Sequence, residues 1–257
     1  MEKIVVDYCF SNSVAKIVLS SGKGNVLDSG MMNELHDILS SLKNMKDIKL
    51  IIFEGAGKHF SFGASVEEHT KEKAQEMLSN FHQLFYEIIE LSIPTIAIIS
   101  GQCLGGGLEL ALICNFLWAD KSAKFGQPEI VLAVFAPVAS VLLPQKINSI
   151  YADSLLITGQ TISAEEAYKI GLINEIFENK EVMDMALNEW IEKNILPKSA
   201  SSLRYAVKVS RNRINSIFKK KLPKLENIYI KELMETYDAN EGITAFLEKR
   251  PPVWRNS

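Results

Sequence analysis

Short apolar runs alternate with longer stretches of helical periodicity along the first half of the chain. Runs rich in Ile, Val and Leu are typical of strands, and they occupy residues 4–8, 14–19, 50–53, 95–100 and 116–119. Apolar side chains at helical spacing predict helices over 31–42 and about 71–91, and Pro94 follows the end of the second. This alternation predicts an α/β fold, which on pattern alone would be a doubly wound sheet.

Beyond residue 160 the pattern becomes mainly helical. Apolar periodicity predicts helices over residues 164–169, 182–195, 199–214, 222–234 and 239–247. We therefore divide the chain into a core with the candidate site, residues 1–198, and a C-terminal helical region, residues 199–257. A helical end of this kind is expected to pack against another surface.

Composition and charge favour a cytoplasmic enzyme. The chain has 257 residues and 47% hydrophobic content, which is enough for one substantial core. A net charge of -3 gives no general attraction to nucleic acid or to anionic membranes. The three cysteines lack Cys-x-x-Cys spacing and are expected to be reduced thiols. We expect no membrane span, no targeting segment and no metal, since the four histidines are not spaced as ligands.

A glycine-rich segment is the strongest candidate for chemistry. Residues 101–109 read Gly-Gln-Cys-Leu-Gly-Gly-Gly-Leu-Glu and connect the strand at 95–100 to a helix-like run over 108–119. Consecutive glycines let bare backbone approach a ligand, and unpaired amides at a helix start suit an oxyanion. A tight turn with Glu109 as an ordinary first-turn acid explains the same segment. A dinucleotide loop is a poorer alternative, because the glycine spacing does not fit.

Two further segments carry residues that fit the same chemistry. Residues 125–129 read Phe-Gly-Gln-Pro-Glu and supply a second carboxylate, Glu129. Residues 57–68 follow the strand at 50–53 through a glycine-bearing loop, in which the amide of Ala64 could complete a pair of donors. Together the segments predict a site where two amides and two carboxylates converge, which suits an enolate.

In order and spacing these segments resemble the crotonase, or enoyl-CoA hydratase/isomerase, superfamily. The resemblance spans nearly the whole chain and includes Ala-Phe-Leu-Glu-Lys-Arg at residues 245–250. It implies a spiral of ββα turns, followed by a C-terminal helical region that forms trimers, commonly paired into hexamers. It also implies an acyl-CoA thioester as the substrate, with no cofactor besides the coenzyme A of that substrate.

The resemblance assigns roles to particular positions. Ala64 and Gly106 match the residues whose backbone amides hold the thioester oxygen, and Glu109 and Glu129 match the paired catalytic glutamates. The presence of both acids favours hydration over isomerisation, decarboxylation or thioester hydrolysis. Candidate substrate-binding residues are Lys23 near the CoA phosphates, Phe135 in the acyl pocket, and Phe246 and Lys249 as contacts from a neighbouring subunit.

Several positions depart from the common pattern of the superfamily. Ser65 stands where Asp is usual, Glu67 where a basic residue is common, and the apolar stretch 131–140 where a glycine-rich loop is usual. That stretch either shapes the acyl pocket or only packs. With these features the motifs resemble cyclohexa-1,5-diene-1-carboxyl-CoA hydratases of anaerobic benzoyl-CoA breakdown. The resemblance implies 6-hydroxycyclohex-1-ene-1-carboxyl-CoA as product, and the alternative is a short-chain enoyl-CoA hydratase.

A basic segment supports a hypothesis of a different class. Residues 204–224 contain eight Lys and Arg residues and no Asp or Glu. They could form a nucleic-acid-binding face, as in crotonase-fold proteins that bind RNA. Contacts to CoA phosphates, a subunit contact or solubility explain the same charges, and the acidic remainder of the chain would repel polyanions. We therefore expect an acyl-CoA as the partner and no nucleic acid.

Overall fold

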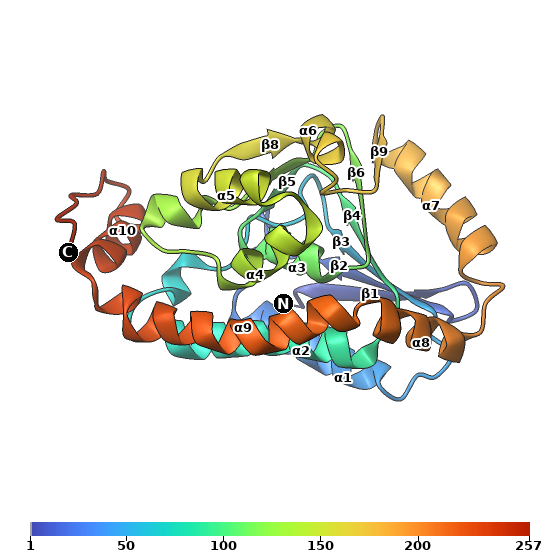
Figure 1. Ribbon diagram of the computed structural model, residues 1–257. Helices are drawn as coiled ribbons and strands as arrows, with labels where there is room; N and C mark the ends of the chain where they lie inside the picture. Colours follow the sequence, from blue (N-terminus) through green and yellow to red (C-terminus); the bar gives the residue numbers. More distant parts are fainter. Residues whose placement is uncertain (1) are drawn as a thin grey trace.

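The computed structural model describes residues 2–257 and shows two β-sheets surrounded by helices (Figure 1). The larger sheet is parallel except for its first pair, β1 and β2, which is antiparallel. In spatial order its strands are β1 (Ile4–Cys9), β2 (Val14–Leu19), β3 (Leu50–Gly55), β4 (Thr95–Ile99), β6 (Phe116–Asp120) and β9 (Glu175–Phe177).

The smaller sheet consists of three short strands, of which the first two directly follow strands of the larger sheet and the third precedes β9. It contains β5 (Gln102–Leu104), β7 (Lys124–Gly126) and β8 (Thr161–Ser163). Single bridges, Leu27 with Ala64 and Ser61 with Cys103, continue the same stacking toward the N-terminus. Successive turns of the chain thus add one strand to the larger sheet and one short segment to the smaller. This arrangement confirms the spiral of ββα turns and excludes the doubly wound sheet that the pattern alone suggested.

The central strands of the larger sheet are buried on both faces, and successive side chains of each strand point to opposite sides. In β3, Leu50 and Ile52 belong to the apolar cluster under α7 (Lys180–Asn194), whereas Ile51 and Phe53 belong to the main core on the other face. A strand buried on both faces is expected to be continuously apolar, as residues 50–53 of β3 are.

The helices of the first two thirds of the chain mostly follow the strands along the spiral. They are α1 (Ser29–Leu42), α2 (Ala74–Leu91), α3 (Gly106–Ile113), α4 (Pro137–Lys146), α5 (Ser149–Thr158) and α6 (Ala164–Lys169), with the 3-10 helices η1 (Val66–Glu68) and η2 (Pro128–Leu132). The helix-like interpretation of residues 108–119 was wrong beyond Ile113, because Cys114 takes an extended conformation that ends α3 before β6. Helices α4 and α5 were not predicted.

The C-terminal region is helical, as predicted, with different boundaries. It contains α8 (Ala200–Ser210), α9 (Asn212–Lys231), η3 (Leu233–Glu235) and α10 (Tyr237–Leu247). The helix predicted over 199–214 is present as α8 but ends at Ser210, because the chain breaks at Arg211. Helix α9 then begins at Asn212 and runs without interruption through residue 222, where the next helix was predicted to start.

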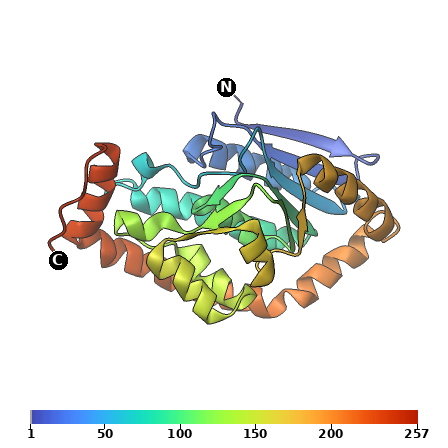
Figure 2. The same cartoon turned by 90° about the horizontal axis from the view of Figure 1, so that it is seen from above.

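Helices α9 and α10 pack on the core of their own chain. Helix α9 lies along α2 and α4, and its side chains Phe218, Leu222 and Tyr229 are buried in the main core. Both views place α10 at the end of the molecule opposite α7 (Figure 1, Figure 2). The predicted role of residues 199–257 in assembly stays a prediction. None of the helices in residues 2–257 combines the length and apolar character needed to cross a membrane.

Candidate active site

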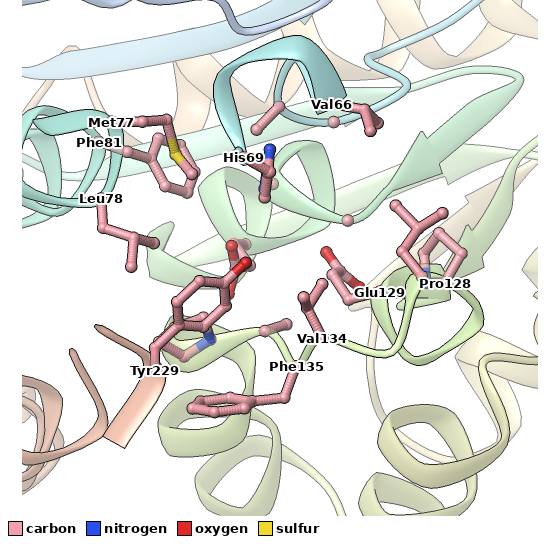
Figure 3. A pocket seen from close by; sticks show the side chains of 18 of the residues that line it. Val66, His69, Met77, Leu78, Phe81, Pro128, Glu129, Val134, Phe135 and Tyr229 are labelled. Carbon is pink, nitrogen blue, oxygen red and sulfur yellow. The ribbon is translucent and has the colours of Figure 1, made fainter. Parts of the chain in front are cut away.

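A small, mostly apolar cavity lies where the glycine-bearing segments of the spiral meet the C-terminal helices (Figure 3). Its volume is about 230 Å³, and Met77, Leu78 and Phe81 of α2 form one apolar wall. Six residues that the sequence analysis selected line this cavity: Ala64, Gly106, Glu109, Glu129, Phe135 and Phe246. Segments from many parts of the chain therefore contribute to one site.

The backbones at Ala64 and Gly106 lie side by side, so closely that little room remains for a side chain between them. A Cβ atom placed on Gly106 would be 3.1 Å from the nitrogen of Ala64, and one on Gly63 would be 2.9 Å from the carbonyl oxygen of Leu104. Gly63 and Gly105 also have φ angles of +103° and +51°, which glycine adopts most readily. Glycine at these positions is what lets the two segments approach each other.

The N–H groups of Ala64 and Gly106 are not used by the fold. Among residues 2–257 neither group donates a hydrogen bond to another residue. The Gly106 amide also stands at the start of α3, where the helix dipole favours negative charge. Two unpaired amides at the wall of an apolar cavity can stabilise negative charge on a bound oxygen.

Glu109 lies in the first turn of α3 and is only 4% exposed. Its Oε1 accepts a hydrogen bond from the backbone N–H of Ala139, at 2.8 Å. Helix α4 has no side-chain cap of its own at Ala136, so Glu109 serves as its cap. Burial raises the pKa of Glu109, and the N–H groups of Ala139 and Val138 partly oppose this by favouring the ionised form.

Glu129 lies in η2 and points into the same cavity (Figure 3). Burial raises the pKa of this carboxyl, and the nearby charge of Glu109 raises it further. The end of the Gln127 side chain lies 3.1 and 3.0 Å from the two carboxyl oxygens. Its amide can donate to an ionised Glu129 or accept from a protonated one, depending on which way it is turned. The N–H donors at Glu109 favour a pair in which Glu109 is ionised and Glu129 protonated.

Two polar residues that the sequence analysis did not select also line the cavity, His69 and Tyr229. The Nδ1 of His69 donates to the carbonyl oxygen of Ser65 at 2.7 Å, and burial lowers the pKa of the ring. His69 is therefore neutral and leaves Nε2 as an acceptor. His69 directly follows the 3-10 helix η1, and Tyr229 lies on the apolar face of the amphipathic helix α9, so neither was selected as a site residue.

The four predicted substrate-binding residues occupy different environments. Phe135 packs edge-on against Tyr229, with ring centroids 5.3 Å apart. Phe246 is 55% exposed and lines the cavity from α10 of the same chain. Lys23 and Lys249 are exposed and do not line the cavity. Their contacts with CoA, and that of Phe246 with a neighbouring copy, stay predictions.

The basic segment at residues 204–224 is partly used inside the fold. Arg204 donates to the carbonyl oxygen of Leu91 at the end of α2, at 3.2 Å. Arg211 donates to the carbonyl oxygen of Ile113 at the end of α3, at 2.8 Å. Both guanidinium groups stabilise helix C-termini, where positive charge is favourable. Fewer of these charges are free to bind RNA than the sequence suggested.

The sequence profile described as "Enoyl-CoA hydratase/isomerase" matches residues 9–257. The chain belongs to the enoyl-CoA hydratase/isomerase family. Family membership confirms the resemblance stated from the motifs. Within residues 2–257, no group of three or more His, Cys, Asp or Glu side chains is placed to hold a metal ion.

Members of the enoyl-CoA hydratase/isomerase family resemble this chain over most of its length. The cyclohexa-1,5-dienecarbonyl-CoA hydratase of Thauera aromatica is 41% identical over 244 residues, which cover 95% of this chain and 93% of the relative. The short-chain-enoyl-CoA hydratase of Clostridium acetobutylicum is 32% identical over 248 residues, covering 92% of each. The crystal structure of an enoyl-CoA hydratase from Mycobacterium avium subsp. paratuberculosis K-10 superposes with a TM-score of 0.86 at 21% identity, covering 99% of each chain. That structure supports the fold.

Proposed function

We propose that the protein adds water to cyclohexa-1,5-diene-1-carboxyl-CoA and forms 6-hydroxycyclohex-1-ene-1-carboxyl-CoA, a step of anaerobic benzoyl-CoA degradation. The observation that carries this proposal is the pair of buried glutamates, Glu109 and Glu129, in an apolar cavity beside two unpaired amides. The 41% identity to the dienecarbonyl-CoA hydratase of Thauera aromatica supports the cyclic substrate.

The two amides hold the thioester oxygen in this proposal. When water attacks the ring carbon β to the thioester, negative charge moves onto that oxygen and a dienolate forms. The N–H groups of Ala64 and Gly106 can stabilise this charge without rearranging. By analogy with acyl-transfer sites, one such donor contributes roughly 3–4 kcal/mol to the stability of the transition state.

The two carboxyl groups divide the proton transfers between them. Ionised Glu109 takes a proton from water while the water oxygen bonds to the β-carbon. Protonated Glu129 then gives its proton to the far end of the dienolate, and the ring keeps one double bond beside the thioester carbon. One molecule of water is added in this 1,4-addition. A proton returning from Glu109 to Glu129 restores the starting state.

The apolar walls suit a ring and exclude bulk water. Leu78, Phe81 and Phe135 surround the space next to the glutamates, and a site without bulk water strengthens the hydrogen bonds to the developing charge. We propose that the CoA part lies outside the cavity, with Lys23 and Lys249 near its phosphates and Phe246 at the entrance. No cofactor besides that CoA is required. We also propose that the protein forms trimers or hexamers and acts in the cytoplasm.

The experiment that tests this function offers the purified protein two substrates separately, cyclohexa-1,5-diene-1-carboxyl-CoA and crotonyl-CoA. The ultraviolet change measures the rate, and mass spectrometry with NMR identifies the product. We expect the 6-hydroxy-1-ene product with little turnover of crotonyl-CoA. The reverse preference would make the protein a short-chain enoyl-CoA hydratase, which its 32% identity to the Clostridium acetobutylicum enzyme also allows.

A further inference from the structure

Tyr229 brings into the cavity a hydroxyl group that bonds to no other part of the described chain. Its side chain, on α9, is only 1% exposed, and its hydroxyl oxygen has no hydrogen-bond partner among residues 2–257. A buried polar group without a partner costs about 1–3 kcal/mol, and most buried hydroxyls are paired. A bound molecule that supplied the partner would recover this cost.

The phenol ring is held in a defined direction. Figure 3 shows it extending from α9 with the hydroxyl toward the centre of the cavity, where Glu129 and His69 also point. Phe135 packs against the ring at 5.3 Å in a T-shaped arrangement. One turn earlier on α9, Glu226 is bonded to Nδ1 of His82 on α2 at 2.5 Å. These contacts fix both the ring and the helix that carries it.

The hydroxyl group stays protonated in this environment. Burial raises the pKa of Tyr229, and the neighbouring carboxyls of Glu129 and Glu109 raise it further. The phenol is therefore no general base. As a neutral hydroxyl it can donate one hydrogen bond and accept another, which suits a water molecule or an alcohol.

We propose that the Tyr229 hydroxyl binds the oxygen atom that water brings to the acyl group, first in the attacking water and then in the product alcohol. This inference rests on the proposed function, in which Ala64 and Gly106 already hold the thioester oxygen. The ring of the substrate carries no other polar atom, so the added oxygen is the matching partner. Tyr229 thereby orients the water and makes the cavity selective for a hydroxylated product.

The test compares two ligands that differ by this hydroxyl alone, 6-hydroxycyclohex-1-ene-1-carboxyl-CoA and cyclohex-1-ene-1-carboxyl-CoA. Calorimetry measures their affinities in the Glu129→Gln background, which suppresses turnover. Adding Tyr229→Phe should weaken binding of the hydroxylated ligand about 10-fold, as expected for one neutral hydrogen bond. Binding of the other ligand should change less than about 2-fold. Tyr86→Phe is the matched control, because Tyr86 packs on Phe218 and does not line the cavity.

Two further readouts separate the alternatives. Tyr229→Phe removes an unpaired hydroxyl, so the Tm of the unliganded protein should stay equal or rise; a lower Tm with equal weakening of both ligands would show a structural role and overturn the inference. Unchanged affinity for both ligands would also overturn it. If the proposed function is wrong, the unmutated protein will not hydrate cyclohexa-1,5-diene-1-carboxyl-CoA, and this result is independent of the Tyr229→Phe test. The comparison would then use 3-hydroxybutanoyl-CoA and butanoyl-CoA.

Discussion

The carboxylate of Glu109 accepts a hydrogen bond from the backbone N–H of Ala139, and this bond joins the first turn of α3 to the first turn of α4. The apolar stretch that departs from the family pattern thus supplies the amide that holds one acid of the pair. The same contact favours the ionised form of Glu109 over that of Glu129. The division of proton-transfer roles proposed above depends on this asymmetry.

Replacing either acid should abolish most of the turnover while leaving ligand binding intact. We expect Glu109→Gln and Glu129→Gln each to lower kcat by about 10²- to 10⁴-fold, the usual contribution of a positioned acid or base. Affinity for cyclohexane-1-carboxyl-CoA should remain close to that of the unmutated protein, because both amides are retained. Steady-state kinetics and calorimetry measure the two effects. Glu87→Gln, at a carboxyl that pairs with His36 and does not line the cavity, is the control. A variant of either acid with near-normal kcat would refute the two-carboxylate mechanism.

The rate of hydration should depend on pH through both glutamates. Glu109 must be ionised, so the rate falls as the pH drops through its raised pKa. Glu129 must be protonated, so the rate falls again as the pH rises through its own raised pKa. We expect a bell-shaped profile of kcat/KM whose acid limb lies above about pH 4.3, the ordinary value for glutamate. An acid limb at that ordinary value would contradict the effect of burial.

Removing the charge of Glu129 should stabilise the protein at alkaline pH. Because the folded-state pKa is raised above the unfolded value, the folded form is favoured at low pH, and this stability is lost as the pH rises through the raised pKa. Glutamine does not ionise, so Glu129→Gln should melt a few degrees higher than the unmutated protein at alkaline pH and equally at acid pH. Differential scanning calorimetry across pH measures the difference.

Glu241 provides a control, because the effect of pH on its contribution to stability is the opposite of that for Glu129. Its hydrogen bonds to Arg250 lower its pKa, so its contribution to stability is present at neutral pH and lost in acid. Glu241→Gln should therefore lower Tm at neutral pH and have little effect once the carboxyl is protonated. A Glu129→Gln variant that behaved in the same way as Glu241→Gln would argue against a protonated Glu129.

A side chain at position 105 should displace the carboxyl group of Glu129 and so lower activity. A Cβ at this position would lie 2.7 Å from Oε1 of Glu129, and φ is +51°. Gly105→Ala should lower kcat at least about 10-fold by displacing that carboxyl. Gly57→Ala is the matched control, because Gly57 has φ of +75° and nothing within 4 Å. Both variants should lose about 1–2 kcal/mol of stability from backbone strain, and equal loss of activity in both would contradict the account.

The strands and the glycine segments could be predicted because their signals are local. A buried strand such as β3 is recognisable from its apolar run, and Gly101 and Gly105 have positive φ angles that other residues adopt poorly. Two of the amphipathic helices, α1 and α2, also appear at nearly their predicted positions. Periodicity and backbone constraint are properties of a few consecutive residues, so sequence alone reveals them.

The contacts that complete the cavity depend on long-range packing and could not be predicted. Helix α4 was missed because Pro144 interrupts an apolar run in which Ser140 is the one polar residue, although Pro137 at its start is typical of a first turn. Tyr229 lies about a hundred residues from the glutamates, on a face that only packing distinguishes from ordinary core. The bond between Glu109 and Ala139 likewise exists only once α3 and α4 meet.

The position of deuterium after hydration in D₂O tests the central claim most directly. If the oxygen adds to the carbon β to the thioester and Glu129 protonates the far end of the dienolate, NMR of 6-hydroxycyclohex-1-ene-1-carboxyl-CoA will show deuterium at ring carbon 3, next to the double bond. Deuterium at ring carbon 5, next to the carbon that carries the hydroxyl, would mean direct addition of water across the C5=C6 double bond of the substrate. That result would contradict the mechanism.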